Sequence, residues 1–375
     1  MIPVNEPVLS GNEKKYLIEC IESGWISSEG PFVKKLEEAM AARVNRKYAI
    51  AVSNGSAALD AAVAALKLGP GDGIIMPAFT IISCAAAIVR SGATPVIVDA
   101  DPLTWNMDLN LLEKTIKHCL SKKGRYTLKA IMAVHIYGLP LDMQNLCILA
   151  DRYGLKVIED AAEMIGQTCR GRACGSFGDV STFSFYPNKH ITTGEGGMIF
   201  TDDPKIAERC RNLRNLFFDH ERRYIHSEIG WNLRMSNIQA AVGVAQLERL
   251  DESLHKKRYI GRMYNELLGT SKGLDLPVQK TEYAENIYWV YGVVLKHEVT
   301  FDAHEAMARL LRKNIGTRHF FYPMNRQPCL KGIVEETDCS VAEQLAERGF
   351  YLPSGLAMSD RQIEAVAEAV KEMMK

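Results

Sequence analysis

The chain has 375 residues, and its 45 basic and 45 acidic side chains give a formal net charge of zero. This length suits a large domain followed by a smaller one. The charge balance argues against a nucleic-acid surface built on overall positive charge, although it leaves room for a local basic pocket that binds a phosphate.

The N-terminus, MIPVNEPVLSGNEKK, lacks a charged start followed by an apolar run, so we do not expect a signal peptide. The most apolar stretch, IIMPAFTIISCAAAIV, contains Pro77, is followed by Arg90 and is too short to span a bilayer. The nine cysteines show no CxxC pair and no Cys/His spacing typical of a metal site. We therefore expect a soluble cytoplasmic protein with free thiols, no metal and no membrane partner.

From about residue 48 to 205 the chain alternates short apolar runs with helical segments. The runs expected to form strands are YAIAV, GIIMP, PVIVDAD, LKAIMAVHIYG, KVIEDAA, VSTFSFY and GGMIFTDD. Alternation of this kind predicts an α/β fold with a mostly parallel sheet covered by helices on both faces. In such sheets, active sites lie at the carboxyl ends of the strands.

After residue 235 the pattern changes. The segment 236–268 has helical spacing throughout and predicts one long helix with a kink near Asp251. The strand-like NIYWVYGVVL and the helical AHEAMARLLRKN and SDRQIEAVAEAVKEMM follow. We therefore predict a large domain over residues 1–250 and a smaller α+β domain over residues 251–375.

The first candidate site is Asn54-Gly55-Ser56, which follows a strand and opens an alanine-rich helix. Backbone N–H groups at a helix start favour an anion, and glycine allows it to approach closely. The simpler interpretation is an ordinary helix cap made by Ser56 or Asn54, and on this motif alone it is the better one.

Asp160 and Glu163 lie in the next candidate motif, VIEDAAE, at the end of an expected buried strand. A buried acid is costly unless a partner compensates it, and a protonated heteroaromatic nitrogen or a lysine would do so. The alternative is that Asp160 and Glu163 form a capping box at the start of a helix.

Lys189 lies between the apolar FSFY and the glycine-rich TTGEGG. A partly buried lysine has a lowered pKa and can form a Schiff base with an aldehyde. The P-loop spacing that would make it a nucleotide-phosphate lysine is absent. A helix start for a phosphate, an acid for a ring nitrogen and a lysine for an aldehyde together match the requirements of pyridoxal phosphate.

The whole chain resembles the DegT/DnrJ/EryC1/StrS family of pyridoxal phosphate-dependent sugar aminotransferases. The motifs that carry the resemblance are GWISSEGPFV, AVSNGSAAL, PAFTIIS, GATPVIVDADPLTWNMD, VIEDAAE, FSFYPNKHITTGEGG, IGWNLRMSNIQAAVGVAQLERLD and LPSGLAMSD. Within the family, NIYWVYGVVL and IGTRHFFYPMNRQP are most similar to GDP-perosamine synthases and their relatives. The resemblance implies fold type I, the architecture of aspartate aminotransferase.

The resemblance also assigns roles at the positions that match the family's motifs. Lys189 would form the Schiff base and shuttle protons, Asp160 would hold the pyridinium nitrogen, and Glu163 would lie near the ring hydroxyl. The residues implied to bind the phosphate are Gly55, Ser56 and Ser184. Asn232 would reach the phosphate of a neighbouring subunit's cofactor, which implies a homodimer; the alternative is that it caps a helix of its own chain.

The SSEGP loop, with Ser27 and Ser28, would border the sugar site together with Arg318. Two departures from the family pattern affect these assignments. Many relatives have an aromatic residue that stacks on the cofactor ring where this chain has Ile81, so stacking is either lost or taken over by Phe79. His319 and Asn325 stand where relatives often show Pro and His, which leaves the sugar open.

The implied reaction moves nitrogen from an amino acid, with glutamate as the expected donor and 2-oxoglutarate as its product, to a keto sugar. The expected sugar is a nucleotide-linked 4-keto-6-deoxyhexose such as GDP-4-keto-6-deoxymannose, used for surface polysaccharides such as O-antigen. A Kdo-type 8-oxo sugar is the alternative. A pyridoxal phosphate-dependent sugar dehydratase would carry histidine in place of Lys189, and the intact lysine, aspartate and glycines disfavour a regulatory protein that only kept the fold.

Overall fold

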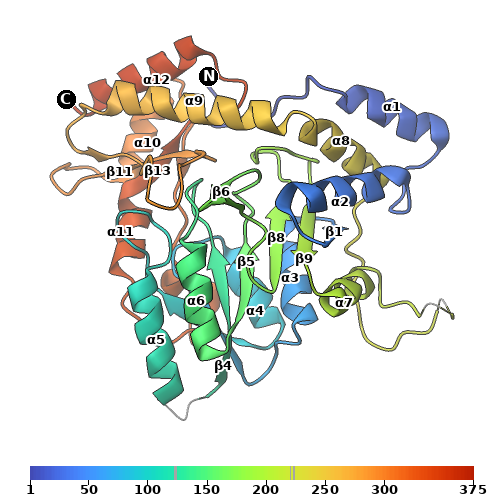
Figure 1. Ribbon diagram of the computed structural model, residues 1–375. Coiled ribbons are helices and arrows are strands. Elements are labelled where there is room, and N and C mark those ends of the chain that lie inside the picture. The colour runs from blue at the N-terminus through green and yellow to red at the C-terminus, as the bar shows by residue number, and fades with distance from the viewer. Residues whose placement is uncertain (122–124, 220, 223) are drawn as a thin grey trace.

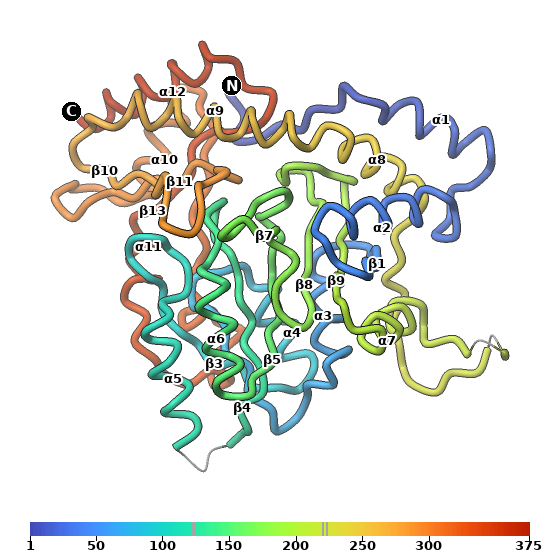
Figure 2. The backbone as a smooth tube through the Cα atoms, in the orientation of Figure 1, coloured from blue at the N-terminus to red at the C-terminus, as the bar shows by residue number. Residues whose placement is uncertain are grey.

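The structure is a computed structural model that describes residues 1–121, 125–219, 221–222 and 224–375. In these residues a large central sheet is flanked by helices, and a smaller sheet lies near both chain termini (Figures 1 and 2). The seven strands of the large sheet are β1 (Tyr48–Val52), β2 (Asp72–Pro77), β3 (Thr94–Val98), β4 (Thr127–Val134), β5 (Lys156–Asp160), β8 (Val180–Ser184) and β9 (Gly197–Thr201). All seven correspond to expected strands.

The order of the large sheet is β1-β9-β8-β5-β4-β2-β3. The strands from β8 to β3 run parallel to their neighbours, whereas β9 runs antiparallel to both β8 and β1. The sheet is therefore mostly parallel, and the predicted α/β class is confirmed. Because every strand of this sheet except β9 runs in the same direction, the carboxyl ends of the other six lie along one edge.

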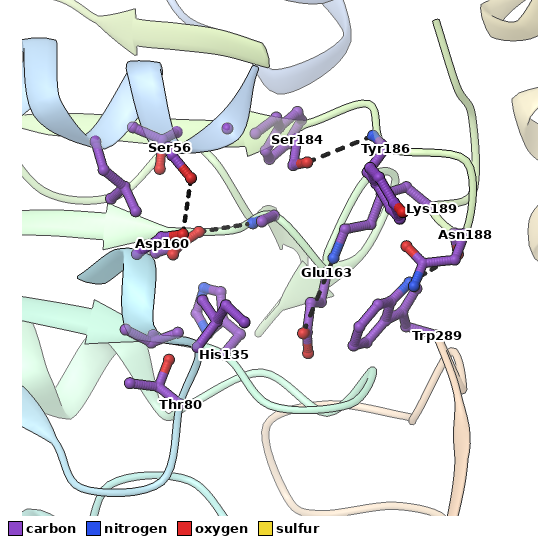
Figure 3. Close-up of a pocket in the computed structure, with 18 of the residues that line it drawn as sticks. Ser56, Thr80, His135, Asp160, Glu163, Ser184, Tyr186, Asn188, Lys189 and Trp289 are labelled. Carbon is purple, nitrogen blue, oxygen red and sulfur yellow. Dashed lines mark hydrogen bonds and ion pairs between the residues drawn. The ribbon is translucent and has the colours of Figure 1, made fainter. Parts of the chain in front are cut away.

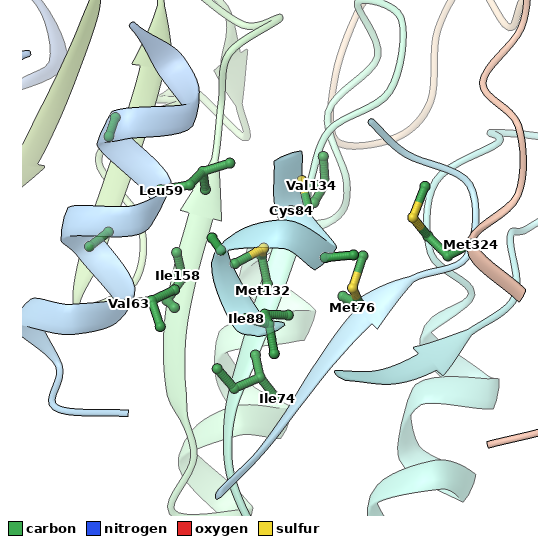
Figure 4. Packing of buried hydrophobic residues seen from close by; sticks show 14 of the residues in the cluster. Leu59, Val63, Ile74, Met76, Cys84, Ile88, Met132, Val134, Ile158 and Met324 are labelled. Carbon is green, nitrogen blue, oxygen red and sulfur yellow. The ribbon is translucent and has the colours of Figure 1, made fainter. Parts of the chain in front are cut away.

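Helices cover both faces of this sheet. Those that contact its strands are α2 (Pro31–Val44), α3 (Gly55–Ala65), α4 (Ile82–Arg90), α5 (Leu109–Ser121), α6 (Met143–Tyr153) and α7 (Pro204–Arg214). Outside this layer, α1 (Glu13–Ser23) packs against α8 (Asn237–Leu247), and α8 packs against α2. Ile74 and Met76 of β2 join the core beneath α3 and α4 (Figure 4), whereas Ile75 between them joins the core beneath α2, α5 and α6. Successive side chains of a strand point to opposite faces, so a continuous apolar run fills two cores.

The smaller sheet is antiparallel, with the order β10-β11-β13-β12. Its elements are α9 (Leu250–Leu268), β10 (Leu274–Asp275), β11 (Tyr291–Leu295), α10 (Ala303–Arg312), β12 (Arg318–His319), the short helices η1 (Met324–Arg326) and η2 (Pro328–Leu330), α11 (Ser340–Arg348), β13 (Gly349–Leu352) and α12 (Asp360–Met373). It has its own core beneath α9, α10 and α12. A short hairpin of β6 (Thr168–Cys169) and β7 (Arg172–Ala173) belongs to neither sheet.

The segment expected to be one helix over residues 236–268 forms two, α8 and α9. The backbone of Arg249, with φ −114° and ψ 13°, leaves helical geometry between them. This break lies just before the predicted kink. The strands of the large sheet all precede it in the sequence, and those of the smaller sheet all follow it. We therefore propose a domain boundary near residue 250. The extreme N-terminus is an exception, because Ile2 pairs with Ile315 beside the smaller sheet.

In the described part of the chain, we find no helix that combines the length and the apolar character needed to cross a membrane. All nine cysteines are free thiols, as expected from their spacing.

The core between α3 and the large sheet yields a stability prediction. Ile158 of β5 is fully buried there, so Ile158→Ala should lower the free energy of unfolding by about 2–5 kcal/mol through lost burial and a residual cavity. Ile148→Ala is the control, since Ile148 on α6 is 51% exposed and should change stability by less than about 0.5 kcal/mol. Urea unfolding measures both, and equal losses would contradict this description of the core.

Candidate active site

A cavity of about 680 Å³ lies at the carboxyl edge of the parallel strands (Figure 3). It is bounded by the ends of β4, β5 and β8 and by the start of α3. Among the predicted site residues, those that line it are Gly55, Ser56, Asp160, Glu163, Ser184, Lys189 and Arg318. The cavity therefore lies where a parallel sheet is expected to place its site, and the predicted residues that it gathers are up to 263 positions apart, from Gly55 to Arg318.

The start of α3 supports both interpretations of Asn54-Gly55-Ser56. The Asn54 side chain caps the helix by accepting a hydrogen bond from the Ala57 amide at 2.8 Å. Gly55 and Ser56 occupy the first helical positions, whose amides have no partner within a helix. A Cβ built on Gly55 would lie 2.7 Å from the Cβ of Ser184, so glycine is required for this approach.

Hydroxyl groups surround the same helix start. The Ser56 hydroxyl is hydrogen-bonded to that of Ser83 at 2.7 Å, and the Ser184 hydroxyl accepts from the Tyr186 amide at 3.4 Å. Amides at a helix N-terminus with hydroxyls beside them form an anion site. The cap and the anion site thus use different atoms of one motif.

Asp160 is buried at the end of β5. Its carboxylate accepts hydrogen bonds from the Ala162 amide at 3.1 Å and from the Cys84 thiol at 3.3 Å. Burial raises its pKa, and these hydrogen bonds only partly oppose that effect. Among the described residues no cation forms an ion pair with this carboxylate, so it is suited to a protonated partner that a ligand would bring.

The capping-box interpretation of Asp160 and Glu163 is wrong. The residues that follow β5 form turns, and no helix begins there in the described chain. Glu163 instead points into the cavity and accepts a hydrogen bond from the Tyr137 amide at 2.6 Å. Burial raises the pKa of Glu163 to about 8, so its carboxyl group can hold a proton near neutral pH.

Lys189 extends from the loop between β8 and β9 toward Glu163, with its Nζ 3.9 Å from the Glu163 carboxylate (Figure 3). Burial lowers the pKa of Lys189, and the charges of Glu163 and Asp160 oppose this. The loop is closed by hydrogen bonds from the Phe185 amide to Gly196 and from the Thr193 amide to Phe185. An amine whose pKa is lowered in this way, on a loop held by backbone hydrogen bonds, is suited to attack a carbonyl group.

Besides Phe79, three predicted residues lie away from the cavity of their own chain. Ser27 and Ser28 lie in the loop between α1 and α2, and Asn232 is exposed and pairs with Asn215 through an isolated bridge. Ser236 caps α8 through a capping box, so Asn232 is not the cap of that helix. A contact between these residues and a neighbouring subunit's site remains a prediction.

The expectation that Phe79 faces the cofactor requires correction. Phe79 is fully buried and packs against Tyr137, Phe320 and Phe321, at centroid distances of 5.7 to 5.8 Å. The side chain that lines the cavity at this place is Ile81, which is 44% exposed. The side chains of Phe79 and Ile81 therefore point in different directions: that of Phe79 is buried among aromatic rings, and that of Ile81 faces the cavity.

The two other positions at which this chain departs from the family pattern, His319 and Asn325, differ in their relation to the cavity. His319 lines the cavity, whereas Asn325 does not, and its side-chain amide donates to Glu343 of α11 at 2.6 Å. Only His319 is therefore placed to influence which ligand enters.

Sequence reasoning missed several side chains of this site. Cys84 donates to Asp160. His135 lines the cavity and is oriented by Glu159 at 3.0 Å and by the Leu141 amide at 3.0 Å. The ring of Trp289 lies 3.7 Å from the Lys189 Nζ. The signal for Trp289 was its place in the NIYW motif, but no local pattern links that motif to a lysine 100 residues earlier.

Comparison with known proteins gives a match over nearly the whole chain. The DegT/DnrJ/EryC1/StrS aminotransferase family model matches residues 7–371. The GDP-perosamine synthase of Vibrio cholerae is 39% identical over 372 residues, which cover 99% of this chain and 98% of that protein. The GDP-perosamine synthase of Caulobacter vibrioides is 40% identical over 376 residues, which cover 100% and 98%. The crystal structure of the aminotransferase TlmJ from Streptoalloteichus hindustanus aligns with a TM-score of 0.90 at 30% identity, over 99% and 98% of the two chains.

The close approach at Gly55 yields a binding prediction. Gly55→Ala places a Cβ against Ser184 and should displace the helix amides, weakening the affinity for pyridoxal phosphate by about tenfold or more through lost charge-assisted hydrogen bonds. Gly69→Ala is the control, because its Cβ would make only ordinary contact, 3.4 Å from the Ser91 carbonyl oxygen. Fluorescence titration measures both, and wild-type affinity in Gly55→Ala would exclude this helix start as the phosphate site.

Proposed function

The chain belongs to the DegT/DnrJ/EryC1/StrS aminotransferase family, and on this premise we propose that it transfers an amino group from L-glutamate to a nucleotide-linked 4-keto-6-deoxyhexose, GDP-4-keto-6-deoxymannose being the favoured substrate. Its class is that of a pyridoxal phosphate-dependent sugar aminotransferase. The observation that carries the finer proposal is the similarity to two GDP-perosamine synthases from one end of the chain to the other.

The residues of the cavity fit pyridoxal phosphate. The helix start at Gly55 and Ser56, together with Ser184, would hold the phosphate, because glycine leaves the amides accessible there. Asp160 is a buried carboxylate with no cationic partner among the described residues, so it would face a protonated ring nitrogen. Lys189 would hold the aldehyde carbon covalently.

When bound, pyridoxal phosphate supplies an aldehyde carbon that carries the amino group and a ring that accepts electrons from the bond being broken. Asp160 would keep the ring nitrogen protonated, because its charge is compensated only when that proton is present. When the Lys189 Nζ is not covalently attached, it would accept the proton that leaves one carbon and return that proton to the carbon that gains it. Glu163, with a pKa of about 8, would hold a proton close to the ring hydroxyl.

For the substrates, we propose that Arg318 contacts an anionic group. It lies at the edge of the cavity beside Tyr351, and it forms no ion pair within the described chain. A guanidinium in this place suits a phosphate or carboxylate oxygen. The proposed product would serve the synthesis of surface polysaccharides such as O-antigen, and the free thiols fit a proposed cytoplasmic location.

We also propose a homodimer with shared active sites. Asn232, Ser27 and Ser28 lie outside the cavity of their own chain, and a neighbouring subunit would bring them to it. In a symmetric dimer each subunit would then complete the other's site.

The activity prediction uses purified protein, glutamate and a panel of GDP-, UDP- and dTDP-linked keto sugars together with a Kdo-type sugar. We expect amination of GDP-4-keto-6-deoxymannose in preference to the others, and loss of turnover by at least about a thousandfold in Lys189→Ala, because no neighbouring base replaces the lysine. Mass spectrometry of the products measures both. Preference for another sugar would replace the proposed substrate, and release of water in place of amination would indicate a dehydratase.

Borohydride reduction serves as the control for the lysine itself. It should fix a pyridoxyl group on the peptide that contains residue 189 in the wild type and on no peptide of Lys189→Ala. A label on another lysine would exclude Lys189 as the covalent attachment point, whichever sugar is preferred.

The shared site is tested by mixing two inactive variants, Lys189→Ala and Asn232→Ala. In a mixed dimer the Lys189→Ala chain supplies an intact Asn232 to the site that keeps its lysine, so about half of the wild-type activity per dimer should return. The two chains are co-expressed with different tags and the mixed dimer is isolated before assay. Activity no greater than that of the two parents would contradict the shared site.

A further inference from the structure

Trp289 connects the smaller sheet to the loop that carries Lys189. It lies two residues before the start of β11, is only 4% exposed and lines the cavity. Its indole Nε1–H donates to the carbonyl oxygen of Asn188 at 2.8 Å. The face of the same ring lies 3.7 Å, centroid to Nζ, from Lys189 (Figure 3). One side chain therefore contacts both the backbone that precedes the lysine and the amine at the end of its side chain.

The Trp289 indole is itself held in place from other sides. Lys257 of α9 is 1% exposed, and its ammonium donates to the Trp289 carbonyl at 2.8 Å and to the Ser354 carbonyl at 2.6 Å. The ring of Tyr137 packs at a centroid distance of 5.9 Å. A buried ammonium that uses its donors on two backbone carbonyls fixes those segments relative to each other. The indole thus has little freedom to follow the lysine.

An indole face attracts a cation more strongly than the face of any other aromatic side chain, and the attraction grows when water is excluded. It stabilises the charged form of Lys189, whereas burial stabilises the neutral form. The other ionisable groups that face the amine are Glu163 and Asp160, which also favour the charged form, and its chain neighbour His190. Among the three side chains that favour the charged amine, Trp289, Glu163 and Asp160, Trp289 is the one whose hydrogen bond holds the loop backbone, at Asn188.

We propose that Trp289 is a positioning residue for Lys189, giving its free amine a defined place and retaining its charge whenever the lysine is not covalently attached. Because the hydrogen bond from Trp289 to the Asn188 carbonyl holds the loop backbone, the Lys189 side chain would return to the same place after each release. The inference rests on the proposed role of Lys189 as the lysine that holds the cofactor.

The test measures the pKa of Lys189 in the cofactor-free, full-length protein. Acetylation of the peptide containing residue 189 is followed against pH by mass spectrometry, because only the neutral amine reacts. Trp289→Leu should lower the pKa of Lys189 by about one unit, the size expected for a desolvated cation–π contact. Trp289→Phe keeps an aromatic face and should restore most of that shift.

Trp105→Leu is the matched control. Trp105 is also a buried indole, 6% exposed, and packs on Tyr137 at 6.4 Å and on Phe320 at 5.3 Å, but it does not line the cavity. Its loss should leave the pKa of Lys189 unchanged while removing a similar amount of buried aromatic surface. An equal shift in both variants would show a general loosening of the structure and overturn the proposal.

An unchanged or raised pKa of Lys189 in folded Trp289→Leu would also overturn it. If Trp289→Leu does not fold, Trp289→Met takes its place, since the longer and more flexible methionine side chain adapts to the space of the indole without an aromatic face. The same fall in the pKa of Lys189 is then required. Acetylation measures the pKa of Lys189 in the protein without its cofactor. An unchanged pKa in Trp289→Leu would therefore overturn the role of Trp289 and leave the proposed amino-group transfer unaffected. Borohydride labelling of another lysine would instead remove the proposed role of Lys189 without altering the measured pKa.

Discussion

Burial of the Lys189 amine is the constraint on which the rest of this site depends. A lysine taken out of water loses hydration that only nearby charges, carbonyls or aromatic faces can replace. Here the replacements are the Glu163 carboxylate at 3.9 Å and the Trp289 ring at 3.7 Å. The balance lowers the pKa of the amine without leaving it isolated, which is the condition under which a lysine is both reactive and able to accept a proton.

That balance requires elements that are distant in sequence. Glu163 follows the parallel strand β5, Lys189 follows β8 of the same sheet, and Trp289 precedes β11 of the smaller sheet. The parallel direction of the large sheet brings the first two to one edge. Trp289 is held near this edge by Lys257 of α9, which donates to the carbonyls of Trp289 and Ser354, and by packing on Tyr137. A lysine with a pKa lowered to about 7 by burial thus holds the segment of Trp289, and the Trp289 indole makes the contact with the catalytic loop.

Phe79 and Trp289 show where reasoning from the sequence reached its limit. Resemblance to relatives directed attention to Ile81 and offered Phe79 as a substitute, yet Phe79 faces an aromatic core of Tyr137, Phe320 and Phe321. The ring that lies over the lysine amine is that of Trp289, which no spacing rule connects to Lys189. The capping box proposed for Asp160 and Glu163 failed for a similar reason, because the capping-box spacing also occurs where the chain forms turns in place of a helix.

The sequence by itself determined the α/β class, the strands of the large sheet and the candidates Gly55, Asp160 and Lys189. Those features follow from local properties: apolar period, turn residues and the chemistry that each side chain can perform. Tertiary structure alone decided which face of each strand enters which core, that Glu163 turns toward Lys189, and that Trp289 and Cys84 complete the site. Such contacts depend on the packing of segments separated by tens to hundreds of residues. Their energies come from burial and geometry in the folded chain, and no short stretch of sequence contains them.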